Sequence, residues 1–169
     1  MPTPPDAQYT IELARPEDAP AIAIMSRELV ERGLRWRYRA EQVRAMLRDP
    51  NICVIVAHQA ETSIGFAAMS FGSRLAHLIL LAVEPEQRRR GTGAALLRWL
   101  ETSAGVAGIA QIVLEVRAAN RSARAFYREQ GYGEQTYLEN YYDGVESAFR
   151  MTRRISVGSP VPAQRFGRI

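Results

Sequence analysis

The sequence predicts an α/β fold in which a mixed, mostly antiparallel sheet is flanked by helices, in the order β-α-α-β-β-β-α-β-α-β-β. Two observations carry this prediction. Three stretches rich in apolar and β-branched residues follow one another with only short turns between them, which favours an antiparallel meander. A strand–helix–strand–helix segment over residues 76–130 comes next and is typical of a nucleotide-type half-site.

The first part of the chain supplies one strand and two helices before the meander. Residues 9–15 alternate apolar and polar side chains, as a half-buried strand does. A helix is expected over residues 16–32, where apolar residues recur at helical spacing and Gly33 can end it. A second short helix is expected over residues 40–48. The meander strands are expected at residues 52–58, 63–71 and 76–83.

The second part of the chain alternates helices and strands. A helix is expected over residues 91–104 and a strand over residues 109–116. The next helix covers residues 120–130, with Asn120 as its N-cap and Gly131 as the glycine that ends it. Two closing strands are expected at residues 132–137 and 148–154.

Length and composition favour one folded unit. We expect residues 1–8 to be a flexible N-terminus, residues 9–155 to be a single domain and residues 156–169 to be a tail. No apolar run approaches the roughly 18–20 residues of a membrane span, so no membrane partner is expected. The single cysteine, Cys53, excludes an internal disulfide and favours a cytoplasmic protein.

The polar residues exclude further classes of site. Two histidines, His58 and His77, lie far apart and neither is spaced with a second ligand, so no metal is expected. The net charge is +4 and every cation is an arginine. The densest arginine run, residues 88–90, has no interleaved aromatic residues, so nucleic acid is not the expected partner. Cys53 lacks an activating neighbour and is interpreted as a small packing residue.

An arginine- and glycine-rich loop follows the third meander strand. Arg88, Arg89 and Arg90 precede Gly91 and Gly93, which open the next helix. Glycines let the backbone approach a ligand, and a helix N-terminus carries partial positive charge. The spacing matches neither a Walker loop nor the dinucleotide fingerprint. The loop therefore predicts a diphosphate site, the alternative being a charged turn before an ordinary helix.

This loop and a second motif together resemble the acetyl-CoA signature of the GNAT superfamily of N-acetyltransferases. The first motif is Arg88-x-x-Gly91-x-Gly93 after Leu81-Ala82-Val83-x-Pro85, and the second is Asn120-x-x-Ala123-x-x-Phe126-Tyr127-x-x-x-Gly131-Tyr132. The resemblance implies acetyl-CoA as the acetyl donor. It implies donor-binding residues that we expect to be Leu81, Ala82, Val83, Arg88, Arg89, Arg90, Gly91, Thr92, Gly93, Ala94, Asn120, Ala123, Phe126 and Tyr127. Leu81 and Val83 would act through backbone groups on an open strand edge, and Asn120 through either the ligand or its N-cap.

Within that superfamily, the chain is most similar to the ribosomal-protein-alanine and related protein N-terminal acetyltransferases. The resemblance rests on residues 114–117 leading to Asn120, and on Asn140-Tyr141-Tyr142 followed by Asp143-Gly144-x-Glu146-x-Ala148. It implies direct acetyl transfer to a protein or peptide N-terminus. A small-molecule amine acceptor and a non-catalytic acyl-CoA-binding domain stay open as alternatives, and a homodimer is also left open. Tyr137, Tyr141 and Tyr142 either line an acceptor groove or pack against their strand.

Three residues are candidates for proton transfer. The resemblance assigns Tyr127 as the acid that protonates the coenzyme thiolate, the alternative being a tyrosine that packs a helix face. Glu115 is the expected base, because apolar neighbours on its strand would raise the pKa of its carboxyl. The alternative for Glu115 is a solvated carboxylate or one paired with Arg117.

His77 is the rival base, because an imidazole titrates near neutrality. Strand alternation predicts that His77 shares one face with Ile79, Leu81 and Val83. The alternative for His77 is a histidine of the rim or core without a chemical role.

Overall fold

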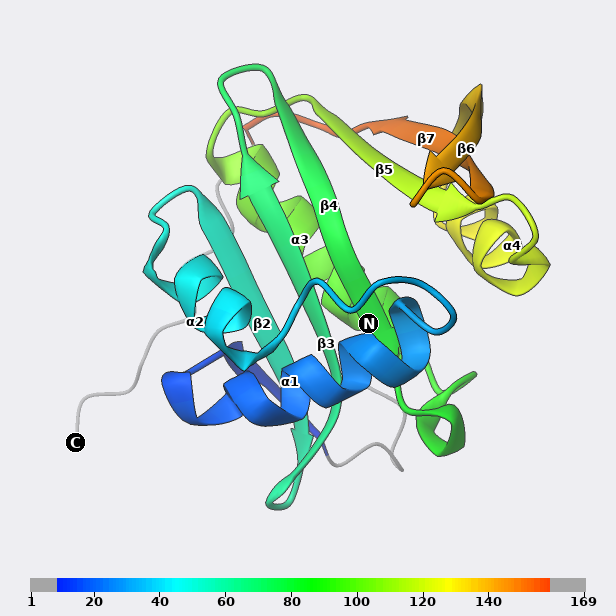
Figure 1. Cartoon of the computed structure of the whole chain (residues 1–169). Coiled ribbons are helices and arrows are strands. Elements are labelled where there is room, and N and C mark those ends of the chain that lie inside the picture. The colour runs from blue at the N-terminus through cyan, green and yellow to red at the C-terminus, as the bar shows by residue number, and fades with distance from the viewer. Residues whose placement is uncertain (1–8, 159–169) are drawn as a thin grey trace.

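The elements follow the predicted order. The computed structural model describes residues 9–158, so the expected flexible N-terminus, residues 1–8, and the tail beyond residue 158 lie outside it. The strands are β1 (Thr10–Leu13), β2 (Ile52–Gln59), β3 (Thr62–Phe71), β4 (Leu75–Val83), β5 (Gln111–Arg117), β6 (Gly133–Tyr142) and β7 (Glu146–Arg154). The helices are α1 (Ala19–Met25), α2 (Ala40–Arg48), α3 (Thr92–Val106) and α4 (Arg121–Glu129) (Figure 1).

The helix expected over residues 16–32 is confirmed in extent but has three parts. A 3-10 turn (Pro16–Asp18) enters α1, and a π-helical turn (Ser26–Val30) leaves it. The wide last turn closes with a hydrogen bond from the Glu31 N–H to the Ser26 carbonyl at 2.7 Å. A π-helical turn displaces the side chains that follow it, and such turns often occur at functional sites. No helix in residues 9–158 combines the length and apolar character needed to cross a bilayer.

The seven strands form one sheet in the order β1-β2-β3-β4-β5-β7-β6. All neighbours are antiparallel except β4 and β5, which run parallel. The parallel pairing covers only Leu75–His77 against Gln111–Val113. The last strand, β7, inserts between β5 and β6, which sets Arg150 directly opposite Glu115. Beyond His77, β4 and β5 separate, and this opening positions the site.

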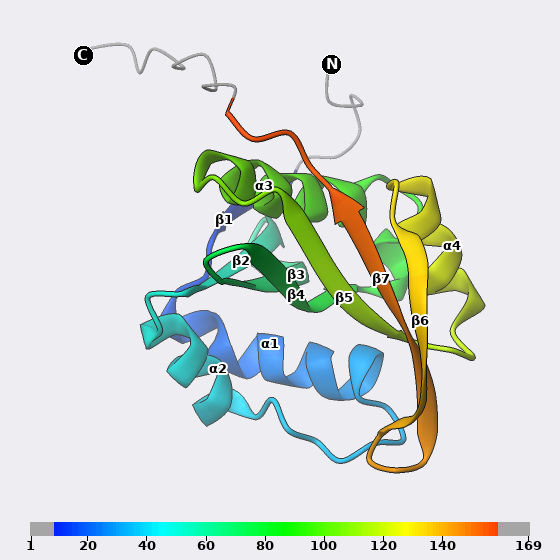
Figure 2. The same cartoon turned by 90° about the horizontal axis from the view of Figure 1, so that it is seen from above.

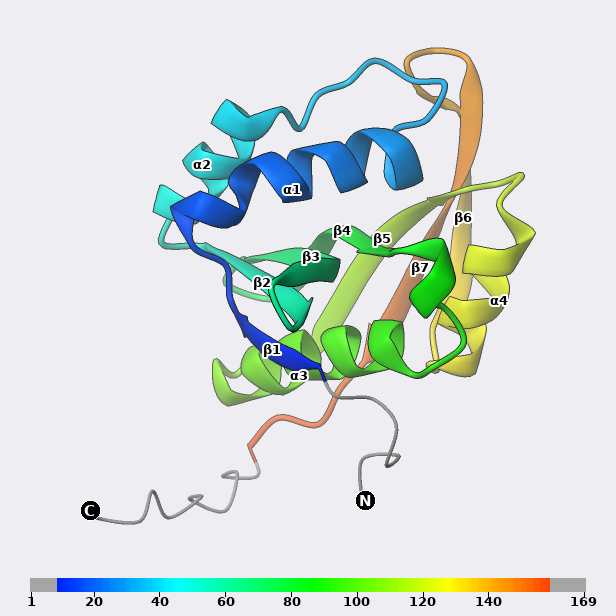
Figure 3. The ribbon, with the colours of Figure 1, turned by 90° about the horizontal axis from the view of Figure 1, so that it is seen from below.

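Helices cover both faces of the sheet. Buried residues of α1 and α2 pack with Val54, Phe66 and Leu80 on one face. Buried residues of α3 pack with Ile55, Met69 and Leu114 among others on the opposite face, where α4 also contributes Tyr127. Figure 2 shows α1 and α2 on one side of the strands and α3 on the other, and Figure 3 shows the same layers from the reverse side.

A β-bulge in β4 changes which residues share a face. Leu78 pairs with Met69 and Leu80 with Ala68, so Ile79 is the extra residue. The predicted single face of His77, Ile79, Leu81 and Val83 is therefore wrong: Ile79 packs toward α1 and α2, whereas Leu81 and Val83 pack toward α3. An extra residue breaks the period-two alternation of a strand. It turns the backbone just where β4 leaves β5.

Candidate active site

The arginine- and glycine-rich loop forms an open anion cradle. A 3-10 turn (Pro85–Gln87) leads from β4 into this loop, and Arg89 and Gly91 both have left-handed backbone conformations, with φ of 61° and 82°. A Cβ built on Gly91 would meet no atom within 4 Å, so the backbone there faces open space. The N-terminus of the 15-residue α3 follows directly. Exposed N–H groups at such a turn and helix start suit an anionic ligand.

The second half-site lies on α4, beside this cradle. Asn120 caps α4, because its side-chain oxygen accepts a hydrogen bond from the Ala123 N–H at 3.0 Å. Phe126 lies against the start of α3, where a Cβ on Gly93 would be 3.5 Å from the ring. The start of α3 is therefore in contact with the Phe126 ring of α4. This contact brings the two sequence motifs side by side.

A cavity of about 950 Å³ lies between these half-sites. Twelve of the fourteen residues expected to bind the donor line it: Leu81, Ala82, Val83, Arg88, Arg89, Gly91, Gly93, Ala94, Asn120, Ala123, Phe126 and Tyr127. Arg90 and Thr92 do not. Arg90 is exposed, whereas the Thr92 side chain, 2% exposed, turns into the core as the first residue of α3. Among the described residues, 9–158, no strand pairs with the edge of β4 that lines this cavity beyond His77.

A second cavity, of about 410 Å³, lies on the other side of the opening between β4 and β5. His77 and Glu115 line it, together with residues of the loop between α1 and α2 and of the β6–β7 turn. Five residues line both cavities: Leu29, Leu81, Asn120, Ala123 and Tyr127. The two cavities therefore meet at Tyr127.

His77 and Glu115, which the sequence presented as rivals, form one hydrogen-bonded pair. The His77 Nε2 lies 2.6 Å from the Glu115 Oε2. The other carboxylate oxygen accepts two hydrogen bonds from Arg150, at 3.1 Å from Nε and 2.9 Å from Nη2. The Glu115 side chain is 9% exposed and that of His77 is 37% exposed. A chain of three side chains from β4, β5 and β7 thus ends at the cavity.

The expected rise in the pKa of Glu115 is wrong. Burial does push the pKa of its carboxyl upward, but the hydrogen bonds and charges of His77 and Arg150 outweigh burial and lower it. Glu115 is not paired with Arg117, whose guanidinium instead contacts Glu146 at 3.1 Å. The sequence suggested burial from the apolar neighbours but gave no sign of Arg150.

Tyr127 is buried at the junction of the two cavities. Its ring makes edge contacts with Phe126 and Tyr132, with centroids 5.2 and 5.8 Å away. Burial raises the pKa of the Tyr127 phenol well above its usual value, and the nearby Tyr142 adds to the rise. The phenol is therefore neutral near pH 7. Packing and a chemical role are compatible here, as the sequence left open.

Two of the three tyrosines that the sequence offered as lining for an acceptor groove line the smaller cavity, and the third does not. Tyr141 and Tyr142 line the smaller cavity. Tyr137 does not line it and packs on Phe149 instead, with ring centroids 5.3 Å apart. Cys53 is half-buried and lines neither cavity, and burial raises the pKa of its thiol. This placement agrees with its interpretation as a packing residue.

Two residues that the sequence did not single out shape the smaller cavity. Arg150 positions Glu115, as described above. Glu31, 7% exposed, accepts hydrogen bonds from the Ser26 hydroxyl at 2.9 Å and from the Arg37 N–H at 2.6 Å. An isolated glutamate after a helix carries no sequence signal of burial, because its partners are mainly backbone groups. The loop between α1 and α2 is fixed by this carboxylate.

Comparison with known proteins places this chain among acetyltransferases. The pattern of the Acetyltransferase (GNAT) family matches residues 18–132. An uncharacterized N-acetyltransferase of Methanocaldococcus jannaschii is 39% identical over 106 residues, covering 62% of this chain and 67% of that protein. The ribosomal protein bS18-alanine N-acetyltransferase of Escherichia coli is 42% identical over 85 residues, covering 48% of this chain and 57% of that protein. The chain thus spans about three fifths to two thirds of these relatives.

Solved structures share the fold. The crystal structure of the E. coli ribosomal-protein-S18-alanine N-acetyltransferase superposes with a TM-score of 0.77 at 28% identity, covering 90% of this chain and 97% of that one. The PaiA N-acetyltransferase of Thermoplasma acidophilum, solved with coenzyme A, gives a TM-score of 0.75 at 22% identity, covering 88% and 100%. The expected resemblance and the expected fold are both confirmed.

Proposed function

Since the chain belongs to the Acetyltransferase (GNAT) family, we propose that it transfers the acetyl group of acetyl-CoA directly to the N-terminal α-amine of a protein or peptide. One observation carries the proposal. Two cavities meet at Tyr127, one bordered by an anion cradle and the other by the His77–Glu115 pair. A donor and an acceptor that enter from opposite sides of the opening would meet at this residue.

The lining of the donor cavity suits acetyl-CoA in charge and in hydrogen-bonding groups. Arg88 and Arg89 add two cations to the N–H groups at the start of α3, which suits a diphosphate. The open space at Gly91 admits a ligand against the backbone. Within residues 9–158, the edge of β4 at Leu81 has no strand partner and offers hydrogen bonds to amide groups, whereas the Val83 carbonyl already accepts a hydrogen bond from Arg88 Nε at 3.0 Å. When bound, the coenzyme supplies the acetyl group as a thioester.

His77 is the proposed base. The lowered pKa of Glu115 keeps its carboxylate ionised, and an ionised carboxylate can only accept hydrogen bonds. His77 Nε2 therefore carries the proton of the 2.6 Å hydrogen bond. In the neutral imidazole of this tautomer the lone pair lies on Nδ1, where it can take a proton from an ammonium. Glu115 stabilises the resulting imidazolium, and Arg150 holds Glu115 in place. Two protons leave the acceptor nitrogen overall; one ends on the coenzyme sulfur and the other reaches solvent through His77.

Tyr127 is the proposed donor of a hydrogen bond to the leaving sulfur. Its buried phenol keeps its proton, so the O–H group can stabilise negative charge that develops beside it. A thiol has an ordinary pKa near 8.5, so the phenol is the weaker acid. We therefore assign hydrogen-bond donation to Tyr127, a smaller role than the complete proton transfer that the sequence suggested.

The acceptor cavity favours a peptide over a small polyamine. A polyamine site needs carboxylates that are available to bind cations. The acidic residues of this cavity already have partners: Glu31 binds backbone N–H groups, Glu115 binds His77 and Arg150, and Asp143 lies 2.6 Å from the Arg37 guanidinium. Tyr141 and Tyr142 offer hydroxyl groups to a peptide backbone. The lone half-buried cysteine supports a cytoplasmic setting as part of the proposal.

A turnover assay with matched acceptors tests the proposal. Release of CoA from acetyl-CoA is measured with a short peptide, with the same peptide blocked at its N-terminus, and with free amino acids and polyamines. The proposal expects turnover with the free peptide alone. Comparable turnover with a polyamine would favour a small-amine enzyme. CoA binding without turnover on any amine would favour a non-catalytic acyl-CoA-binding domain.

A further inference from the structure

A row of arginines lies on the loop that borders the acceptor cavity. The loop between α1 and α2 reads Leu-Arg-Trp-Arg-Tyr-Arg over residues 34–39. Its arginines are exposed, whereas the apolar and aromatic side chains between them are partly buried. We call Arg32, Arg35, Arg37 and Arg39 the arginine strap. Arg35 and Arg37 line the cavity itself, so an acceptor chain that leaves the cavity here passes their guanidinium groups.

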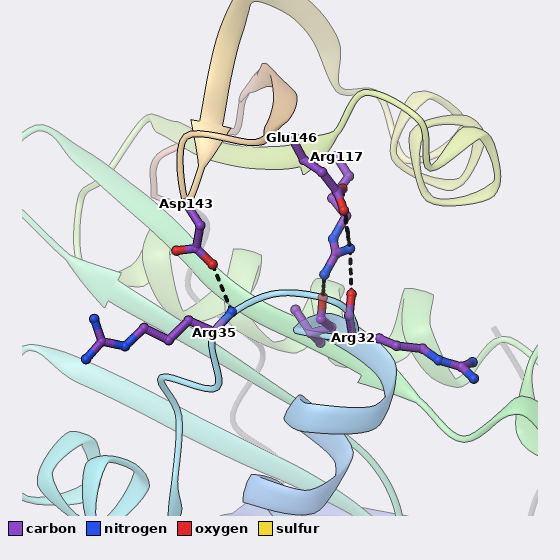
Figure 4. Close-up of polar contacts among 6 residues, drawn as sticks. Arg32, Arg35, Arg117, Asp143 and Glu146 are labelled. Carbon is purple, nitrogen blue, oxygen red and sulfur yellow. Dashed lines mark hydrogen bonds and ion pairs between the residues drawn. The ribbon is translucent and has the colours of Figure 1, made fainter.

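Three side chains fix the backbone of the strap. Glu31 accepts a hydrogen bond from the Arg37 N–H at 2.6 Å. Asp143, on the turn between β6 and β7, accepts one from the Arg35 N–H at 2.8 Å (Figure 4). Arg117 donates to two carbonyls at the end of the preceding helix, at 2.6 and 2.8 Å. The backbone of the strap is therefore held beside the cavity by side chains of the protein itself.

The strap carries more positive charge than its surroundings neutralise. Of the acidic residues around it, Asp143 pairs with Arg37, Glu146 pairs with Arg117, and Glu31 is turned inward to backbone groups. Within residues 9–158, the guanidinium groups of Arg32 and Arg35 form no ion pair, and Figure 4 shows both side chains extending away from the cluster. Of these two cations, Arg35 belongs to the lining of the cavity and is thus available to a partner there.

We infer that the arginine strap selects acceptors whose first few residues after the N-terminus include acidic side chains. The inference rests on the proposed transfer to a peptide N-terminus and adds the charge of the preferred peptide. Opposite charges across an interface raise the association rate and suppress partners of like charge. Arg35 is the residue best placed to make the selection, because it lines the cavity and forms no ion pair with any carboxylate of residues 9–158.

The same loop interleaves arginines with aromatic residues, a pattern also found on surfaces that bind single-stranded nucleic acid. Such surfaces need aromatic faces on which bases can stack. Here the Trp36 ring already has two guanidinium groups above it, those of Arg27 and Arg39, each 5.1 Å from its centroid. Tyr38 is partly buried. The aromatic residues therefore support the loop, and an acidic peptide fits the strap better than RNA.

The test compares kcat/KM for three peptides that begin with alanine and carry glutamate, glutamine or lysine at the next three positions. At low salt we expect the glutamate peptide to exceed the glutamine peptide about three- to tenfold, and the lysine peptide to be poorest. The preference should fade near 0.5 M salt, where the Debye length is only about 4 Å. Arg35→Glu should reverse the order. Arg98→Glu, an exposed site on α3 that lines neither cavity, should leave the order unchanged.

The outcomes distinguish a failure of the charge selection from a failure of the proposed N-terminal acetylation. Equal kcat/KM for the three peptides, with normal turnover, would overturn the charge selection and leave N-terminal acetylation standing. Failure to acetylate any of the peptides would overturn both. Acetylation of the glutamine peptide is also measured with either an oligouridylate or polyglutamate added as an inhibitor. Stronger inhibition by the oligouridylate, abolished by Arg35→Glu, would show that the strap is a nucleic-acid surface and that the inference is wrong.

Discussion

Replacing Tyr127 by phenylalanine isolates the hydroxyl group at the junction of the two cavities. The ring keeps its edge contacts with Phe126 and Tyr132, because only one oxygen is lost. A hydrogen bond to a charged group contributes about 1.5–3 kcal/mol, and 1.36 kcal/mol corresponds to tenfold in rate. We therefore expect the chemical step to slow about 10- to 100-fold, with CoA affinity unchanged. Single-turnover measurements on enzyme loaded with acetyl-CoA avoid masking by product release.

The neighbouring tyrosine supplies a matched control. Tyr132 is 2% exposed, and its hydroxyl donates to Glu101 at 3.0 Å, away from both cavities. Tyr132→Phe should lower the free energy of unfolding by about 1 kcal/mol or more and leave the chemical step unchanged. A normal single-turnover rate for Tyr127→Phe would refute the assignment and make Tyr127 a packing residue. Equal slowing by both variants would show that the loss of either buried hydroxyl disturbs the site, and that the Tyr127 hydroxyl has no particular role at the junction.

The anion loop and the His77–Glu115 pair give three further expectations. Gly91→Ala should raise the Kd for CoA about tenfold or more, since its methyl group enters the cradle. Gly108→Ala, at a glycine with a similar φ of 81° and equally open space, should leave the Kd unchanged. Equal losses of CoA affinity in the two variants, measured by calorimetric titration, would count against the cradle. His77→Gln should lower kcat/KM about 10²-fold at neutral pH, and the deficit should shrink above about pH 8, where an α-amine loses its proton unaided; a deficit constant with pH would exclude the base role. Because the pKa of Glu115 is lowered in the folded state, its ionised carboxylate stabilises the fold above the ordinary carboxyl range, and this stabilisation is lost as pH falls through the lowered pKa. The melting temperatures of wild type and Glu115→Gln should therefore converge on acidification. A difference in melting temperature that widened in acid would contradict this expectation.

Sequence signals that act over a few residues predicted much of the fold. Helix α2 begins and ends at the expected residues, Ala40 and Arg48, because helical spacing and the following Asp-Pro mark it locally. The N-cap role of Asn120 is confirmed for the same reason. The glycines, the arginines and the strand before them predicted the anion loop. Each of these features depends on neighbours close along the chain.

Features that depend on distant pairing could not be predicted in this way. The insertion of β7 between β5 and β6 brings Arg150 opposite Glu115, and no local pattern states which strands become neighbours. That contact reverses the expected direction of the pKa shift of Glu115. The bulge at Ile79 likewise arises from the register between β3 and β4 and moves residues between faces. The site therefore depends partly on which strands pair and in what register, and local sequence patterns do not predict either.

The most direct test of the central claim locates the acetyl group on a peptide that offers two amines. The peptide begins with alanine, carries glutamates after it, and contains one internal lysine. After incubation with acetyl-CoA and the protein, fragmentation by mass spectrometry identifies the modified nitrogen. The account predicts acetylation of the N-terminal α-amine, with the lysine side chain unmodified. Acetylation of the lysine in preference to the α-amine would contradict it.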